Sequence, residues 1–215
     1  MRKNGIKNTP PKGTSKTNSN GILLTGHNYV AKYEETIAER GGQHMIVRAT
    51  EAIKQANRLV RKHGTRDADR LASELGIIVV PRNFVKQKGV YKVIERNRYV
   101  FIKNDLEPVM HSIVLLHEIG HDTLHRKESV ATGGFKEFNI FDMQDRRMEY
   151  EANVFAAQVS LPDEEVLNYI YQGYDIGQIA RFMRSDINLV ALKADSLIIQ
   201  GHRLRPQEHR NNFLK

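Results

Sequence analysis

The chain has 215 residues, 40% of them hydrophobic, which is enough to form one hydrophobic core. It contains no cysteine, so disulfides and thiolate metal ligands are excluded and any bound zinc would have only nitrogen and oxygen ligands. No apolar run approaches the roughly 20 residues that a membrane span needs, and no apolar signal segment follows the basic N-terminus. We therefore expect a cytoplasmic protein with no membrane span.

The formal net charge of +8 comes partly from the first twenty residues, which contain no acidic residue. Lysine and arginine are interspersed there with proline, glycine, serine and asparagine, a composition that cannot support a core. We expect residues 1–45 to form a disordered extension. Its simplest role is to keep the protein soluble, and the alternative is weak electrostatic attraction to nucleic acid or to an acidic partner.

Two helices are predicted after this extension. Residues 46–60 place apolar side chains at every third or fourth position, which is typical of an amphipathic helix, and Gly64 should end it. Either Thr65 or Asp67 can cap a second helix that stops at Gly76.

Three short β-strands should follow. The apolar run 77–80 is ended by Pro81, and residues 90–94 and 99–102 are expected to pair through a charged turn at 95–98. The strand 99–102 is the candidate for a sheet edge to which an extended peptide could add by backbone hydrogen bonds.

A His-Glu-x-x-His pattern lies on a predicted helix that starts just after Pro108. Helical positions four apart share one face, so His117 and His121 can bind one ion while Glu118 holds a water that the ion polarises. Gly120 is disfavoured in a helix by about 1 kcal/mol relative to alanine, which suggests the close approach of another backbone segment near the metal. The alternative is a metal-free helix with two half-buried, hydrogen-bonded histidines.

A catalytic zinc site usually has a third protein ligand, which a second predicted helix downstream can supply. Glu149 and Asn153 are four residues apart, so Glu149 could ligate zinc while Asn153 hydrogen-bonds and orients one of the two histidines. Glu151 is rotated about 200° from Glu149 and is expected to face solvent or Arg147. The alternative is that these charges only decorate an exposed helix face.

His125 is also a candidate for the site, although not as a ligand. It lies eight residues, or about 12 Å along the helix axis, from His117, which is too far for one ion to bind both. We expect it to cap the end of the helix, and the alternatives are a group that supports a metal ligand from behind or a hydrogen-bond donor to the transition state. Tyr91 and Tyr99 are further candidates for that donor.

The rest of the chain should be a loop followed by helices. Residues 126–144 are predicted to form a loop or lid. The last two of the three helices beyond it resemble a helix-turn-helix only faintly, although the final one contains Lys193, and we favour scaffold helices. The overall fold class is α+β, mostly helical with a small sheet before the His-Glu-x-x-His helix. The three C-terminal helices are expected at 164–172, 176–184 and 189–199.

The segments HEIGHDTLHR and EYEANVFAAQVSLP resemble the ImmA/IrrE family of zinc metallopeptidases, which are gluzincin-like. The resemblance covers roughly residues 46–205 and departs from the family at 159–162, where the family's Leu-Leu-x-Pro ending reads Val-Ser-Leu-Pro. It implies a zincin-like peptidase domain over 46–205 that includes the C-terminal helices at 163–199, followed by a flexible tail at 206–215.

The resemblance also implies a function. Zinc would be the cofactor, with His117, His121 and Glu149 as its ligands and Glu118 as the catalytic base. Such an enzyme would be an endopeptidase that cleaves a helix-turn-helix repressor in bacteria, prophages or mobile elements. The alternative is a non-proteolytic regulator, a zinc-stabilised fold that binds DNA or a repressor through its basic surface.

Overall fold

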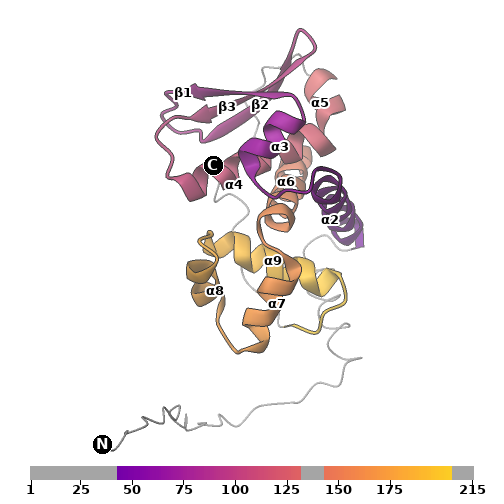
Figure 1. Cartoon of the computed structure of the whole chain (residues 1–215). Coiled ribbons are helices and arrows are strands. Elements are labelled where there is room, and N and C mark those ends of the chain that lie inside the picture. The colour runs from indigo at the N-terminus through magenta and orange to yellow at the C-terminus, as the bar shows by residue number, and fades with distance from the viewer. Residues whose placement is uncertain (1–42, 132–142, 205–215) are drawn as a thin grey trace, which may run out of the picture.

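The computed structural model describes residues 43–131 and 143–204 (Figure 1). Residues 1–42 of the predicted N-terminal extension, most of the predicted loop at 126–144 and the C-terminal tail lie outside these residues and stay predictions. The boundary predicted at residue 45 is wrong by three residues, because 43–45 already belong to the first described helix. The described part is an α+β fold, as expected, with a small sheet on one side of a helical layer and further helices on the other side. None of its helices is long and apolar enough to cross a membrane.

The elements follow the predicted order along the chain. The strands are β1 (Ile77–Arg82), β2 (Gly89–Ile94) and β3 (Asn97–Lys103). One element differs from expectation, because the start of the predicted loop at 126–144 is a short helix, α5. The helices are α2 (Gln43–His63), α3 (Ala68–Glu74), α4 (Pro108–Leu124), α5 (Arg126–Ala131), α6 (Met143–Ser160), α7 (Asp163–Tyr171), α8 (Ile176–Phe182) and α9 (Ile187–Ile199).

The strand order in the sheet is β1-β3-β2. The predicted pairing of the second and third strands is confirmed, and a two-residue turn joins them at Glu95 and Arg96, whose φ angles are +48° and +68°. Positive φ at both positions suits the twist of a tight hairpin. The prediction that 99–102 is an edge strand is wrong, because β1 pairs with β3 in parallel and makes β3 the central strand.

One face of the sheet packs on α4 and the other does not. Val100 and Ile102 of β3 are buried against the core, at 0% and 1% exposure. Since side chains alternate along a strand, Tyr99 and Phe101 project from the opposite face, where their rings stack with centroids 5.8 Å apart. The side chains of β3 that point towards α4 are therefore the even-numbered ones.

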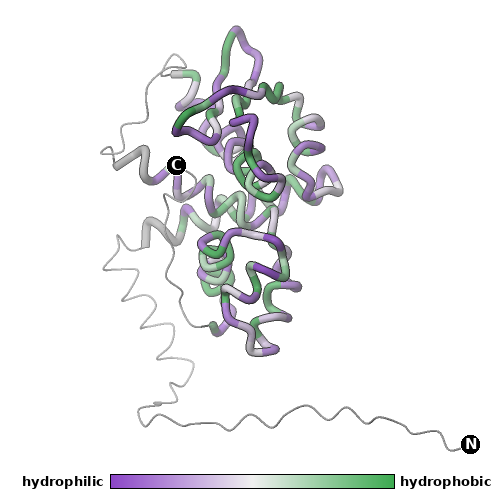
Figure 2. The backbone as a smooth tube through the Cα atoms, turned by 90° about the vertical axis from the view of Figure 1, so that its left-hand side faces the viewer, coloured by the Kyte–Doolittle hydropathy of each residue, from purple (hydrophilic) through white to green (hydrophobic). Residues whose placement is uncertain are grey.

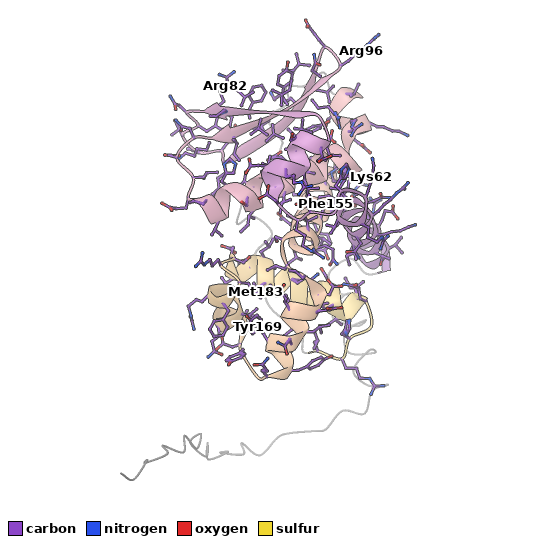
Figure 3. All side chains as sticks on the ribbon, in the orientation of Figure 1. Lys62, Arg82, Arg96, Phe155, Tyr169 and Met183 are labelled. Atoms are coloured by element: carbon purple, nitrogen blue, oxygen red, sulfur yellow. The ribbon has the colours of Figure 1, made fainter. Side chains whose placement is uncertain are left out.

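Helices α4 and α6 cross at very close range, next to the fully buried Phe155 at the centre of the molecule (Figure 3). A Cβ atom placed on Gly120 would lie 3.2 Å from the Cα atom of Ala152 and 3.3 Å from its carbonyl oxygen. The expected reason for a glycine at this helical position is thus confirmed, because a second backbone passes directly against it.

The C-terminal helices α7, α8 and α9 form a unit on the side of α6 away from the sheet (Figure 1). Their backbone alternates between hydrophobic and hydrophilic residues, as amphipathic helices require (Figure 2). Lys193 of α9 is 0% exposed and donates hydrogen bonds to Gln158 Oε1, at 2.5 Å, and to Asp163. A buried lysine cannot contact DNA, so Lys193 no longer supports a helix-turn-helix, and its contacts are those of a residue that packs α9 against α6.

The buried Lys193 gives a test of how this unit is attached. Lys193→Met should lower the free energy of unfolding by about 3 kcal/mol, because it leaves the buried Gln158 and the half-buried Asp163 without their cation. Urea denaturation measures the change. The control is Lys54→Met at a side chain that is 72% exposed, for which a change within about 0.5 kcal/mol is expected. Equal changes in unfolding free energy for the two variants would contradict the conclusion that Lys193 attaches the C-terminal helices to α6.

The helix crossing gives a second test. Gly120→Ala gains about 1 kcal/mol in helix propensity. Overpacking against the Ala152 backbone costs about 1–3 kcal/mol, and we expect this term to dominate and to lower the unfolding free energy. Ser112→Ala, on the same helix but partly exposed, is the matched control. A Gly120→Ala protein more stable than wild type in the same urea titration would show that the crossing is looser than described.

Candidate metal centre

The two motif histidines lie one turn apart on the buried face of α4. His117 is 4% exposed and His121 is 5% exposed, and their Nε2 atoms are 3.1 Å apart. Glu149 reaches the pair from α6, with Oε2 3.5 Å from His117 Nε2 and Oε1 3.5 Å from His121 Nε2. The close crossing of the two helices thus brings together residues that are about thirty positions apart in sequence.

This donor set fits a single metal ion. Two ligand atoms bound tetrahedrally to zinc at about 2.0–2.1 Å would be about 3.3–3.4 Å apart, close to the observed separations. Imidazole nitrogen and carboxylate oxygen are ligands that zinc accepts. Within residues 43–131 and 143–204, these three residues form the one cluster of its kind with atoms close enough to share an ion.

The electrostatics of the cluster favour metal-binding protonation states at Glu149 and His121, whereas at His117 the hydrogen bond and charge of Glu149 outweigh burial and raise the pKa. Burial alone would raise the pKa of Glu149, but hydrogen bonds and charges from His117 and His121 outweigh it and hold that pKa well below the usual range. Burial is also the main reason that the pKa of His121 falls to about 4. Glu149 is therefore ionised and His121 neutral at physiological pH, as metal ligands must be.

Asn153 lies where the sequence places an orienting residue. It is 0% exposed, and its Oδ1 atom is 2.8 Å from His117 Nδ1. When His117 Nδ1 carries the proton and donates to this oxygen, the Nε2 lone pair is left to face Glu149. Asn153 and Glu149 share a face of α6, so one helix supplies both the third candidate ligand and the residue that orients the first.

Glu151 does not face solvent, and the alternative expectation of a contact with Arg147 is confirmed. It is only 8% exposed, and its Oε1 atom is 2.9 Å from Arg48 Nη1 of α2 and 3.7 Å from Arg147 Nε. Its Oε2 atom is 2.8 Å from His125 Nε2. His125 does end α4, where its N–H donates to the carbonyl of His121 at 2.9 Å, but its ring is turned inward and is 3% exposed.

Glu118, the candidate base, lies on α4 and is buried between the His-His-Glu cluster and the edge of β2. Burial raises its pKa to about 7, and the backbone N–H of Tyr91 hydrogen-bonds its carboxylate. A Cβ atom on Gly89 would lie 2.7 Å from Glu118 Oε1 and 2.6 Å from a methyl group of Val114. Gly89 therefore leaves the room that the carboxylate occupies, a role that no motif in the sequence reveals.

The three candidate donors to a transition state have different positions. His125 Nδ1 is 3.1 Å from His121 Nδ1, so its ring lies directly behind a ligand. The Tyr91 hydroxyl donates to Asp122 Oδ1 at 2.7 Å, and burial and this carboxylate raise its pKa. Tyr99 projects from the far face of the sheet and cannot reach the cluster. Neither tyrosine side chain is available to the site.

Asp122 is a buried residue that connects α4 to the β2–β3 hairpin by hydrogen bonds, a role that the sequence does not indicate. It is 1% exposed, and its carboxylate also accepts hydrogen bonds from Arg98 of β3 at 3.0 Å and from Arg126 at 2.7 and 3.1 Å. These bonds tie the hairpin of β2 and β3 to α4. Glu118 lies on α4 four residues before Asp122, so these bonds also hold the backbone of Tyr91 against Glu118.

Comparisons with known proteins agree with this geometry. Residues 72–194 match the Peptidase_M78 family, described as the IrrE N-terminal-like domain. The chain is 34% identical over 146 residues to Uncharacterized immunity region protein 2 of Bacillus phage phi105, which covers 67% of this chain and 86% of that protein. It is 24% identical over 127 residues to Metallopeptidase ImmA of Bacillus subtilis (strain 168), covering 58% of this chain and 72% of that protein. With its buried His-His-Glu cluster in the matched region, the chain belongs to the ImmA/IrrE family of metallopeptidases.

Proposed function

We propose that the protein is a zinc-dependent endopeptidase. The observation that carries the proposal is the carboxylate of Glu118, which is buried next to a cluster that fits one metal ion. A structural metal site needs only its ligands. An additional carboxylate held beside the cluster, where it can accept a proton from a water molecule, is what general base catalysis requires.

His117, His121 and Glu149 would hold the zinc. When bound, zinc would polarise a water molecule and the scissile carbonyl group. The Glu118 carboxylate accepts the proton that this water loses and can then donate it to the leaving amine. Its position is fixed by the Tyr91 N–H and by the space that Gly89 leaves.

An extended substrate would lie along the outer edge of β2, in place of the edge expected at 99–102. Among the described strands, β2 pairs with β3 alone. The hydrogen bond from Lys103 N–H to Lys88 O sets the alternation of this ladder, so that the N–H groups of Gly89, Tyr91 and Val93 point away from β3. The Tyr91 N–H donates to Glu118, so the N–H groups of Gly89 and Val93 are the ones that would pair with a substrate. Backbone pairing there would place a peptide bond beside Glu118.

A helix-turn-helix repressor is the proposed substrate. Support comes from the family resemblance and from a relative named for the immunity region of a phage. Weak contact of the basic N-terminal segment with nucleic acid would bring the enzyme close to a DNA-bound repressor. The alternative of a non-proteolytic DNA-binding regulator is not favoured by any described contact, and the helix that suggested it has its lysine buried.

The first prediction of this proposed function concerns the metal. Protein purified without chelator or affinity tag should contain about one zinc per chain by elemental mass spectrometry, as a single catalytic site requires. Glu149→Gln should weaken zinc binding by more than the roughly 10–100-fold that loss of a supporting hydrogen bond costs, because it removes a ligand charge. Glu165→Gln, at an exposed position on α7, is the control. A wild type that stays free of zinc after refilling and desalting would overturn the proposal.

The second prediction separates metal binding from catalysis. Glu118→Gln should keep its zinc and lose about 10²–10⁴-fold in peptide hydrolysis, since only the proton acceptor is removed. Hydrolysis can be followed by mass spectrometry on a proteome-derived peptide mixture and on a repressor from the same genetic element. Cleavage at the wild-type rate by Glu118→Gln would exclude the mechanism.

The third prediction concerns the position of Glu118. Gly89→Ala should retain zinc but lose on the order of 10²-fold in activity, the effect of a displacement of about 1 Å in a catalytic group. Val90→Ala, one residue along and on the opposite face of β2, should leave activity near the wild-type value. Equal losses in the two variants would indicate general damage to the hairpin instead.

A further inference from the structure

Two glutamates on α6, two residues apart, stand in different relations to the histidines of α4. Glu149 lies directly against His117 and His121. Glu151 is 2.8 Å from His125, and His125 in turn is 3.1 Å from His121. The second glutamate therefore reaches the cluster through an intervening imidazole ring.

Metal binding at His121 would fix the direction of both hydrogen bonds in the series His121–His125–Glu151. If His121 binds an ion through Nε2, its proton must be on Nδ1, which then donates to His125 Nδ1. His125 must consequently carry its own proton on Nε2, where it donates to Glu151 Oε2. Nδ1 of His125 is then an acceptor and Nε2 a donor, an arrangement that is consistent only with a neutral His125.

At the end of this hydrogen-bonded series of side chains, away from His121, the Glu151 carboxylate is bound by a cation. Arg48 of α2 donates from Nη1 to Glu151 Oε1 at 2.9 Å. Arg147 of α6 lies near the same carboxylate oxygen, with its Nε atom 3.7 Å from Glu151 Oε1. The carboxylate is therefore ionised and can accept from both sides, and α2 is linked to the metal centre across more than a hundred residues of sequence.

We propose that His125, supported by Glu151 and Arg48, is a positioning residue that fixes the tautomer and ring orientation of His121 for metal binding. The inference rests on the proposed function only in taking the cluster to be a metal site. His117 and His121 are then oriented by different means, the first by the neutral amide of Asn153 and the second by an imidazole backed by a carboxylate. A carboxylate behind an imidazole increases the basicity of the ligand it supports.

The tautomer of His125 can be measured directly. Long-range proton–nitrogen correlation spectra of the full chain, labelled with nitrogen-15 at histidine and loaded with zinc, distinguish the two neutral tautomers and the imidazolium. We expect His125 neutral with its proton on Nε2, its signals being assigned by their loss in His125→Gln. A proton on Nδ1 of His125, in either the other tautomer or the imidazolium, would overturn the proposal because that nitrogen could not accept from His121.

Metal affinity tests the function of the hydrogen bond. His125→Leu should weaken zinc binding by about 10–100-fold in competition with a chromogenic chelator. His125→Asn retains an acceptor oxygen near the position of Nδ1 and should recover part of this loss. His111→Leu, near the start of the same helix and partly exposed, is the control and should change little. Equal affinities of the Leu and Asn variants would overturn the proposal, because a packing role alone would not distinguish them.

Glu151→Gln completes the series. It keeps the size of the side chain but removes the charge behind His125, so a loss of zinc affinity smaller than that of His125→Leu is expected, while Glu165→Gln should show none. An affinity of Glu151→Gln equal to that of Glu165→Gln would show that the carboxylate does not act on the ligand. None of these measurements needs a substrate, so they stand apart from the test of peptide hydrolysis by Glu118→Gln.

Discussion

The metal cluster depends on the contact between α4 and α6 at Gly120 and Ala152. Because Gly120 has no side chain, the α6 backbone passes within van der Waals distance of α4. Glu149 lies one turn before Ala152 on the same face of α6, so the contact that brings the helices together also brings the carboxylate to the two histidines. A wider crossing would separate Glu149 from the α4 histidines.

Buried charges then hold the surrounding elements in place around this crossing. Asp122 joins the hairpin to α4 through Arg98, and Lys193 joins the C-terminal helices to α6 through Gln158. Buried ion pairs add little net stability in general, since desolvation offsets their attraction. Their effect here is geometric: the first keeps the edge of β2 against Glu118, and the second keeps α9 packed on α6.

Features that depend on local periodicity could be predicted from the sequence, and those that depend on distant partners could not. The spacing of four residues was enough to pair His117 with His121 and Glu149 with Asn153. The strand order was not predictable, because it depends on β1 adding in parallel to β3 rather than on either strand's own pattern. Glu151 shows the same limit, since its angle on the helix was right but its partner Arg48 lies on another helix.

A single helix, α6, supplies the third candidate ligand, the orienting amide and the carboxylate behind His125. These groups keep fixed relative positions because they share one rigid backbone, so the cluster is arranged when α6 packs on α4. The entropy of ordering the ligands is then lost on folding and not on metal binding, which favours tight binding. Linkage requires the converse as well: an ion that binds only the folded cluster stabilises the helix crossing, and with it the position of Glu118 on the edge of β2.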